Sequence, residues 1–351
     1  MKRPLWPEAR NMPKILIAGA GIAGSYLYRL LVKRGLGLKD IIEVVDPGSA
    51  TRCGIPSCGF ATTRQFFTLC REVGLDPDKY ILASPDTGYA NGIKFQIKGH
   101  IFSIDKPGFI RDLLAGATVN SSTGDKVAER IVDATGTARA YIGKYEHDII
   151  YPCIQKKVEF SHPHALAEYP HNVGYSWVIP LEGRSAHVGI GSNTYNSEAM
   201  KKVVESLAEG ARTICACKGF IRGTGPILPL VQGNIWAVGE AGGLVDPLSG
   251  AGIIPAMVSA KLLVDHWDDP KGYEAAIMKK YGWFRKSASL VEEWQNKGTL
   301  NTGKLLGLWR QYAELAGLDY RVLSLARIDL IRSMLRIALR APKMRQDESM
   351  K

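Results

Sequence analysis

The stretch KILIAGAGIAG, from Lys14 to Gly24, decides the fold of this chain. Its apolar residues lead directly into a GxGxxG pattern, and residues 24–34 then place leucines at helical spacing. A second apolar run, Ile41 to Val45, ends at Asp46. This order predicts a strand, a tight glycine turn, a helix and a second strand, which together begin a dinucleotide-binding α/β domain.

Each glycine of this turn has its own physical task in such a domain. The first permits the tight turn, the second lets the backbone approach a pyrophosphate, and the third packs the helix against the strand. Free N–H groups and the helix dipole favour the negative charge of the pyrophosphate. The acid at the end of the second strand accepts hydrogen bonds from the adenosine ribose. We therefore predict cofactor contacts from Gly19, Ala20, Gly21, Ala23, Gly24 and Asp46.

A second glycine-rich segment follows the apolar run Ile235 to Val238 and indicates which dinucleotide is bound. It begins Gly239-Glu240-Ala241-Gly242-Gly243, and a carboxylate at a strand end can reach the ribityl hydroxyls of a flavin. A helix that begins near Gly250 would direct its N-terminus at the pyrimidine edge of the flavin, where it stabilises reduced flavin. The segment favours FAD over NAD. The predicted contacts here are Gly239, Glu240, Gly250, Ala251, Gly252 and Ile253.

Between the two glycine-rich segments the pattern becomes that of an antiparallel sheet. Residues 149–160, 174–181 and 186–191 read as strands, and residues 88–104 read as a hairpin with a turn at 98–100. We predict an α/β fold with a Rossmann-like FAD-binding domain, an inserted antiparallel β-sheet substrate lobe and a helical C-terminus. The expected boundaries are 14–87, 105–148 and 222–268 for the FAD-binding domain, 88–104 and 149–221 for the lobe, and 269–351 for the basic helical region.

Composition excludes several other classes of protein. Hydrophobic residues make up 46% and charged residues 23%, as in a folded soluble protein. No apolar run reaches the roughly eighteen residues that a membrane span needs, and residues 1–13 lack the apolar region of a secretory signal. The six cysteines lack the paired spacing of a zinc site, so we expect no metal and a reducing cytoplasm.

The formal net charge of +11 leaves several partners open. It fits solvated lysines, an anionic lipid surface or a phosphorylated substrate. Because no nucleic-acid-binding module is visible, we expect no nucleic-acid partner.

Four motifs, in this order, resemble those of the geranylgeranyl reductase family of flavoproteins, which share the p-hydroxybenzoate-hydroxylase-like FAD fold. The cysteine loop after the second strand of that family matches Arg52-Cys53-Gly54, followed by Cys58-Gly59. A strand that ends DATG matches Asp133–Gly136, and YxWxFP matches Tyr175–Pro180. The family motif GDAAG…PxTGEGI is similar to Gly239–Gly243 and Pro247–Ile253.

The resemblance implies an FAD-dependent reductase that saturates carbon–carbon double bonds of geranylgeranyl-type isoprenoid chains, as in membrane lipids. Reduced flavin would supply a hydride to one alkene carbon while a proton reaches the other. Cys53 is implied to lie near the alkene as a proton donor or positioning group, with Cys58 as the second candidate. A buried packing role for Cys53 stays open.

The resemblance also adds residues around the flavin. Tyr175 and Trp177 lie two apart on one strand and therefore share a face, where they form either an apolar wall for the isoprenoid or the core of the sheet. Lys106 stands where hydroxylases of this fold usually have an Arg that contacts the cofactor. With Asp133 and Gly136 of the DATG motif, it completes the expected cofactor contacts.

Departures from the family pattern keep other functions open. Glu240 replaces an Asp, Ala251 a Glu and Ile179 a Phe. One alternative is a flavin-dependent monooxygenase of the same fold, although those enzymes typically have His where this chain has Gly243. Another is a non-catalytic flavin-binding protein at a membrane surface. The sequence does not name the electron donor, because it has one complete dinucleotide fingerprint and no iron–sulfur cysteine set. We therefore expect NAD(P)H to dock transiently or a ferredoxin to donate.

Residues 321–340 have the pattern of an amphipathic helix. Four arginines lie within one arc of a helical wheel and apolar residues lie on another. Either the helix packs on the protein with a solvated basic face, or it contacts an anionic membrane from the cytoplasmic side. The expected location is therefore the cytoplasm, with peripheral contact to the cytoplasmic membrane left open.

If the helix lies on a membrane, changing Arg321, Arg332, Arg336 and Arg340 to Gln should release the protein from anionic vesicles without loss of FAD. Each basic residue near such a surface contributes about 1 kcal/mol, and added salt screens the attraction. Co-sedimentation with vesicles at low and high salt measures the effect. A wild-type protein that ignores anionic vesicles at low salt would assign the helix to ordinary packing.

Overall fold

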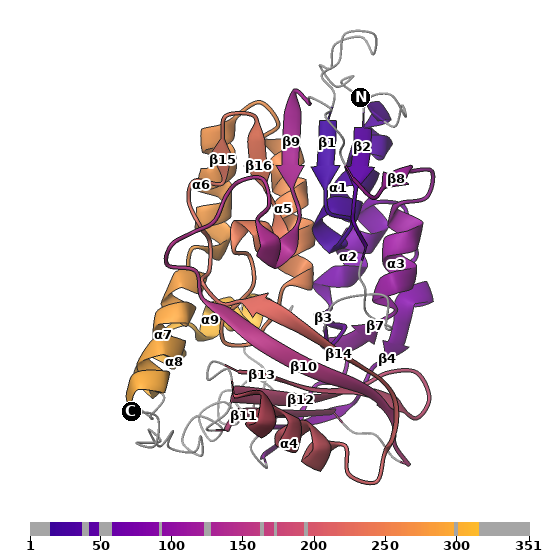
Figure 1. The fold of residues 1–351 in the computed structure, drawn as a ribbon, viewed down its shortest axis with the longest axis vertical. Helices are drawn as coiled ribbons and strands as arrows, with labels where there is room; N and C mark the ends of the chain where they lie inside the picture. The colour runs from indigo at the N-terminus through magenta and orange to yellow at the C-terminus, as the bar shows by residue number, and fades with distance from the viewer. Residues whose placement is uncertain are drawn as a thin grey trace.

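The computed structural model describes residues 15–36, 42–48, 58–90, 93–122, 128–161, 165–171, 174–192, 196–297 and 301–315. These residues form three sheets and the helices that cover them (Figure 1). Cys53 and residues 321–340 lie outside the described residues.

The first sheet carries the dinucleotide-binding pattern and has the strand order β15-β16-β9-β1-β2-β8. Its strands are β1 (Ile15–Ala18), β2 (Ile42–Val45), β8 (Val119–Asn120), β9 (Arg130–Asp133), β15 (Val231–Gln232) and β16 (Ile235–Ala237). All neighbours run parallel except β15 and β16. The sheet is assembled from three separate stretches of sequence, which confirms the Rossmann-like α/β fold.

Both faces of this sheet are buried, which explains its uninterrupted apolar strands. Ile15, Ile17 and Val132 pack into the main core beneath helices α1 (Ile22–Leu31) and α5 (Ile253–Asp265), which contact each other. Leu16 packs on the opposite face in a smaller cluster. Helices α2 (Gln65–Glu72) and α3 (Lys106–Leu113) extend the helical layer (Figure 1).

The second sheet is the expected antiparallel lobe, with the order β14-β10-β13-β12-β11-β5-β6. Its strands are β5 (Thr87–Ala90), β6 (Ile93–Gln96), β10 (Ile150–Glu159), β11 (Ala165–His171), β12 (Gly174–Pro180), β13 (Ser185–Gly191) and β14 (Arg212–Arg222). Only β5 and β11 pair in parallel among them. Helix α4 (Ser197–Leu207) packs on the face that carries Val158, Val178 and Val188. Trp177, which alternates with Val178 on β12, therefore lies on the other face.

A third sheet, β3-β7-β4, differs from what the sequence predicts. It contains β3 (Ala61–Thr63), β4 (Ile81–Ala83) and β7 (Ile101–Ile104). The hairpin expected over residues 88–104 is wrong in its pairing, because β6 pairs with β5 whereas β7 pairs with β3 and β4. The turn at 98–100 thus connects two sheets. Ser103 joins them again by donating a hydrogen bond from Oγ to the Pro180 carbonyl over 2.6 Å.

The C-terminal part is helical as expected, as far as residue 315. It comprises α6 (Pro270–Tyr281), α7 (Phe284–Lys297), α8 (Thr302–Gly307) and α9 (Trp309–Leu315). The buried hydroxyl of Tyr273 on α6 donates to the carbonyl of Ala237 at the end of β16, over 2.8 Å. None of the helices in the described ranges has the length and apolar character that a membrane crossing requires.

His187 makes the stability of this fold depend on pH. Its side chain on β13 is 3% exposed, and it packs edge-on against Phe60 with ring centroids 4.5 Å apart. Burial lowers the pKa of His187 to about 4, whereas the pKa in the unfolded chain is about 6.5. Between these two pH values the unfolded state binds more protons, so stability is full above pH 6.5 and is lost as the pH decreases toward 4.

Changing His187 to Gln should remove this part of the acid sensitivity. Between pH 7 and pH 5 the wild type should lose about 2 kcal/mol more unfolding free energy than the variant, as measured by urea denaturation. His147→Gln, at an exposed position, is the matched control. If the variant and the wild type show the same pH dependence, His187 is not buried in its neutral form.

Candidate functional site

Three glycine-containing turns meet at the carboxyl ends of β1, β9 and β16, which are neighbours in the sheet. A Cβ added to Gly19 would lie 2.3 Å from the Ala134 carbonyl oxygen, and one added to Gly239 would lie 2.8 Å from the Ala23 Cβ. The GAGIAG, DATG and GEAG turns are therefore in direct contact. Open α/β sheets bind their ligands at this edge.

The N-terminus of α1 leaves space where a pyrophosphate is expected. A Cβ on Gly21 would meet no heavy atom within 4 Å, whereas one on Gly24 would lie 2.0 Å from the Gly19 carbonyl oxygen. Gly21 caps α1 without a side-chain hydrogen bond. Gly24 thus serves helix–strand packing and Gly21 keeps the approach to the backbone open, as an anion at a helix N-terminus requires.

Asp46 lies beside this turn and keeps part of its hydrogen-bonding capacity. Its Oδ2 accepts from the Ala20 N–H over 2.7 Å, and its Oδ1 accepts from the Gly48 N–H over 2.7 Å. A carboxylate has about four acceptor sites, so two remain for the hydroxyls of a ribose. The half-buried side chain fits the predicted contact.

Asp133 has surroundings that the sequence did not predict. It is fully buried, and its Oδ1 accepts hydrogen bonds from the N–H and the hydroxyl of Thr135 over 3.1 and 2.6 Å. Its Oδ2 accepts from the N–H groups of Tyr141 and Ile142, each over 2.9 Å. The protein itself uses these acceptor sites, so Asp133 shapes the turn that carries Gly136. Direct contact between Asp133 and a cofactor stays a prediction.

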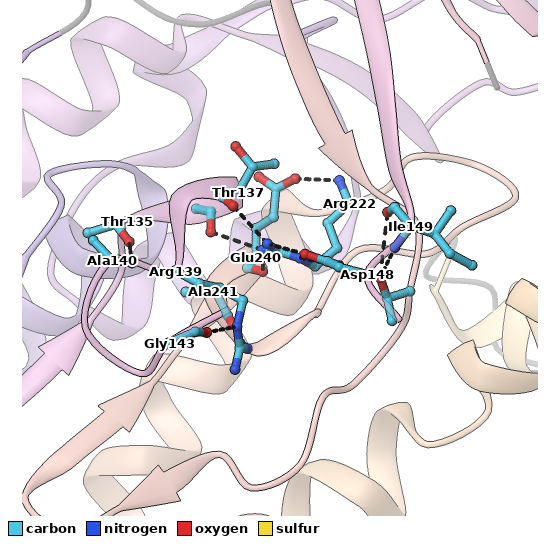
Figure 2. A network of polar contacts seen from close by, with 12 residues as sticks. Thr135, Thr137, Arg139, Ala140, Gly143, Asp148, Ile149, Arg222, Glu240 and Ala241 are labelled. Atoms are coloured by element: carbon cyan, nitrogen blue, oxygen red, sulfur yellow. Dashed lines mark hydrogen bonds and ion pairs between the residues drawn. The ribbon is translucent and has the colours of Figure 1, made fainter. Parts of the chain in front are cut away.

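Glu240 lies in a short helical turn, η5 (Gly239–Gly242), against the DATG turn (Figure 2). Its Oε1 accepts from the Arg222 backbone N–H over 2.8 Å, and a Cβ on Gly136 would lie 3.6 Å from its Oε2. Burial raises the pKa of Glu240, while Arg222 and the Lys106 ammonium act in the opposite direction. Glu240 and Lys106, both predicted cofactor contacts, are thus near enough for the Lys106 charge to influence the Glu240 carboxyl.

The segment between η5 and α5 is held by a buried carboxylate. Asp246 Oδ2 accepts from the N–H and hydroxyl of Ser249 over 2.8 and 2.5 Å, and Oδ1 accepts from the Ser287 hydroxyl of α7 over 2.7 Å. Gly250 adopts a φ of 67°, and Gly252 caps α5 without a side-chain hydrogen bond. These contacts hold the segment in place, while Gly252 leaves the N–H groups at the start of α5 without a side-chain acceptor.

Tyr175 and Trp177 lie on one face of β12, as predicted, with ring centroids 5.4 Å apart. Tyr175 reaches the segment before α5, because a Cβ on Gly250 would lie 2.3 Å from its hydroxyl oxygen. Trp177 crosses Gly189 of β13, whose added Cβ would lie 2.4 Å from the indole ring. The pair therefore forms an aromatic wall that also packs the sheet, so the two interpretations of these residues are compatible.

Gln155 on β10 belongs to the same wall and is not among the site residues predicted from the sequence. Its side chain is 4% exposed; Oε1 accepts from Trp177 Nε1 over 3.1 Å and Nε2 donates to the Cys58 carbonyl over 3.1 Å. A Cβ on Gly59 would lie 2.3 Å from Ile179 Cδ1. The Cys58-Gly59 end of the cysteine loop thus rests on the wall. The one signal in the sequence was that the Gln155 side-chain amide occupies an inward-facing position of the strand expected over residues 149–160.

Comparisons with known proteins connect this geometry to a family. No protein-family model matches the chain. It is 24% identical to an uncharacterised protein of Methanocaldococcus jannaschii over 85% of this chain and 95% of that one. It is 23% identical to the digeranylgeranylglycerophospholipid reductase of Picrophilus torridus over 76% and 81% of the two chains. Identity to the enzyme of that name from Methanosphaerula palustris is 31%, over 25% of this chain and 24% of the relative.

A solved structure with a similar fold has a name of the same kind as these relatives. The geranylgeranyl bacteriochlorophyll reductase-like protein of Thermoplasma acidophilum superimposes with a TM-score of 0.64 at 17% identity, over 92% of this chain and 99% of that chain. These similarities support the resemblance to the geranylgeranyl reductase family of flavoproteins that the four sequence motifs indicate. Solved structures of the same fold include flavin-dependent enzymes, which supports the prediction of a flavin cofactor.

Enzymes that carry out other reactions have the same fold. A tryptophan 6-halogenase of Streptomyces toxytricini superimposes with a TM-score of 0.62 at 15% identity, over 79% of this chain and 78% of that one. The fold alone therefore does not identify the reaction, which has to be inferred from the residues around the site.

Two glycine substitutions should separate cofactor binding from folding. Gly21→Val should weaken flavin binding at least about tenfold, because the new side chain enters the space for the pyrophosphate. Its apoprotein should melt near the wild-type temperature. Gly24→Val should instead lower the free energy of unfolding by at least about 1–3 kcal/mol, because its Cβ would clash with the Gly19 carbonyl oxygen.

Flavin fluorescence titration and thermal melts of the apoproteins measure the two effects. Gly307→Ala, a helical position in α8 with no heavy atom within 4 Å of the added Cβ, is the control for both. A Gly21→Val protein with wild-type flavin affinity would place the pyrophosphate elsewhere.

Proposed function

We propose that the protein is an FAD-dependent reductase that saturates carbon–carbon double bonds of geranylgeranyl-type isoprenoid chains in membrane-lipid biosynthesis. The observation that supports this best is the contact of Tyr175 with Gly250, which brings the aromatic wall to the segment before α5. An isoprenoid chain has no hydrogen-bonding groups along its length, so a protein recognises it by shape and by burial of apolar surface. Tyr175, Trp177 and Ile179 offer such a surface.

The proposal of FAD rests on the residues at the edge of the parallel sheet. Asp46 has acceptor sites left for an adenosine ribose, and the open space at Gly21 accommodates a pyrophosphate. Both features suit a dinucleotide better than a mononucleotide. When bound and reduced, the flavin would supply the hydride.

The protein's own residues place the alkene and deliver the proton. Gln155 accepts a hydrogen bond from the Trp177 indole N–H and donates one to the Cys58 carbonyl, so it joins the aromatic wall to the Cys58-Gly59 end of the cysteine loop. A hydride transferred to one alkene carbon requires a proton at the other. We assign this proton delivery, or the positioning of the alkene, to Cys53, with Cys58 as the alternative.

The proposed electron donors and the proposed location at a membrane surface are based on the net charge of the protein and on the proposed substrate. An isoprenoid lipid resides in a membrane, and a net charge of +11 suits peripheral contact with an anionic cytoplasmic surface. NAD(P)H or an acidic ferredoxin would donate the electrons.

Anaerobic reoxidation of the reduced enzyme tests the proposal. Mixing with a short geranylgeranyl compound should reoxidise the flavin and add two hydrogens per saturated bond, as read by absorbance and mass spectrometry. Cys53→Ala should leave flavin reduction intact and slow reoxidation at least about tenfold, the lower range of acid–base contributions. Cys70→Ala, a buried cysteine on α2, is the matched control.

Three other outcomes would overturn parts of this assignment. Reoxidation that needs oxygen and yields a hydroxylated product identifies a monooxygenase. A flavin that stays reduced with every isoprenoid identifies a non-catalytic flavoprotein. Unchanged turnover in Cys53→Ala returns that residue to a packing role.

A further inference from the structure

Arg222, the last residue of β14, is buried where the antiparallel sheet meets the cofactor turns (Figure 2). All three nitrogens of its guanidinium donate hydrogen bonds. Nε donates to both Asp148 oxygens over 2.9 and 3.0 Å, and Nη1 donates to the carbonyls of Gly136 and Glu240 over 3.0 and 2.6 Å. Nη2 donates to the Thr137 carbonyl over 2.7 Å and to Asp148 over 2.8 Å. The five N–H groups of an arginine are thus fully used.

The acceptors belong to three separate parts of the site. Gly136 ends the DATG turn after β9 and Thr137 follows it, Glu240 belongs to the GEAG turn after β16, and Asp148 precedes β10. The ion pair with Asp148 alone would use only some of the guanidinium N–H donors. The three carbonyl contacts go beyond charge pairing and connect both cofactor turns to the sheet that carries the aromatic wall.

Glu240 is held by the same residue at two points. The Arg222 side chain donates to the Glu240 carbonyl, and the Arg222 backbone N–H donates to Oε1 of the Glu240 carboxylate. Oε2 is left on the side of Gly136. The orientation of the carboxylate therefore depends on where Arg222 lies.

We propose that Arg222 is the positioning residue of the flavin site, which orients the Glu240 carboxylate for the cofactor and sets the two turns relative to the aromatic wall. The proposal rests on the flavin-binding part of the proposed function and not on the isoprenoid. Lysine would not replace Arg222, because a single ammonium cannot reproduce the planar arrangement of five donors.

A double-mutant cycle on flavin affinity tests whether Arg222 acts through Glu240. Arg222→Lys, which keeps the charge, should weaken flavin binding at least about tenfold. Glu240→Gln should weaken binding about tenfold in the wild type but less than about twofold in the Arg222→Lys protein, because the carboxylate is already misplaced. Asp46→Asn, at the other end of the cofactor, should have the same effect in both backgrounds.

Arg212→Gln is the matched control on the same strand. Arg212 lies at the opposite end of β14 from Arg222, where its side chain is 74% exposed and pairs with Glu159 over 2.5 Å. Its loss should therefore leave flavin affinity within about twofold of the wild type. If Arg222→Lys does not fold, as judged by its thermal melt, Asp148→Asn takes its place in the cycle. This variant keeps the shape of the side chain and removes the charge that orients the guanidinium.

Two results would overturn the inference. One is flavin affinity within about twofold of the wild type in Arg222→Lys or, where that does not fold, in Asp148→Asn. The other is an equal effect of Glu240→Gln in both backgrounds, which would leave Arg222 with a purely structural role. A protein that passes these tests but reduces no isoprenoid would retain the inference and lose the proposed substrate.

Discussion

The close approach of backbone at the carboxyl ends of three parallel strands is the constraint on which the site depends. Gly19 lies so near the Ala134 carbonyl that any side chain would collide with it. The register of β1 with β9, which pairs Ala18 with Asp133, sets this approach. Because the turns touch, a ligand at the sheet edge meets backbone from β1, β9 and β16 together, and the shape of the cofactor site follows from strand pairing.

Buried carboxylates then shape the turns at this edge. Asp133 accepts four hydrogen bonds from the turn after β9, and Asp246 accepts from both Ser249 and Ser287. Burial raises the pKa of Asp246, while the hydroxyl and N–H donors act to lower it. Buried polar groups without hydrogen-bond partners would be costly, so these donors are what permits irregular backbone at this edge of the sheet.

The antiparallel sheet has a different task on each face. One face packs on α4 through Val158, Val178 and Val188 and stabilises the lobe. The other carries Tyr175, which contacts the segment before α5, and Trp177, with glycines of β13 beneath both rings. Arg222 connects this sheet to the turns that follow β9 and β16, so under the proposed function one residue would link the placement of the substrate to that of the flavin.

The sequence by itself determined the features that depend on residues close together in the chain. The apolar run with GxGxxG predicted β1, the turn and α1, and the two-residue spacing placed Tyr175 and Trp177 on one face, because strand and helix periodicity is local. Only the tertiary structure decided which distant strands pair, as for β7, and which buried groups meet. Arg222 forms hydrogen bonds with Asp148, 74 positions away in the sequence, and Gln155 forms one with Cys58, 97 positions away. Such contacts depend on packing of whole sheets, and no periodicity in the sequence encodes them.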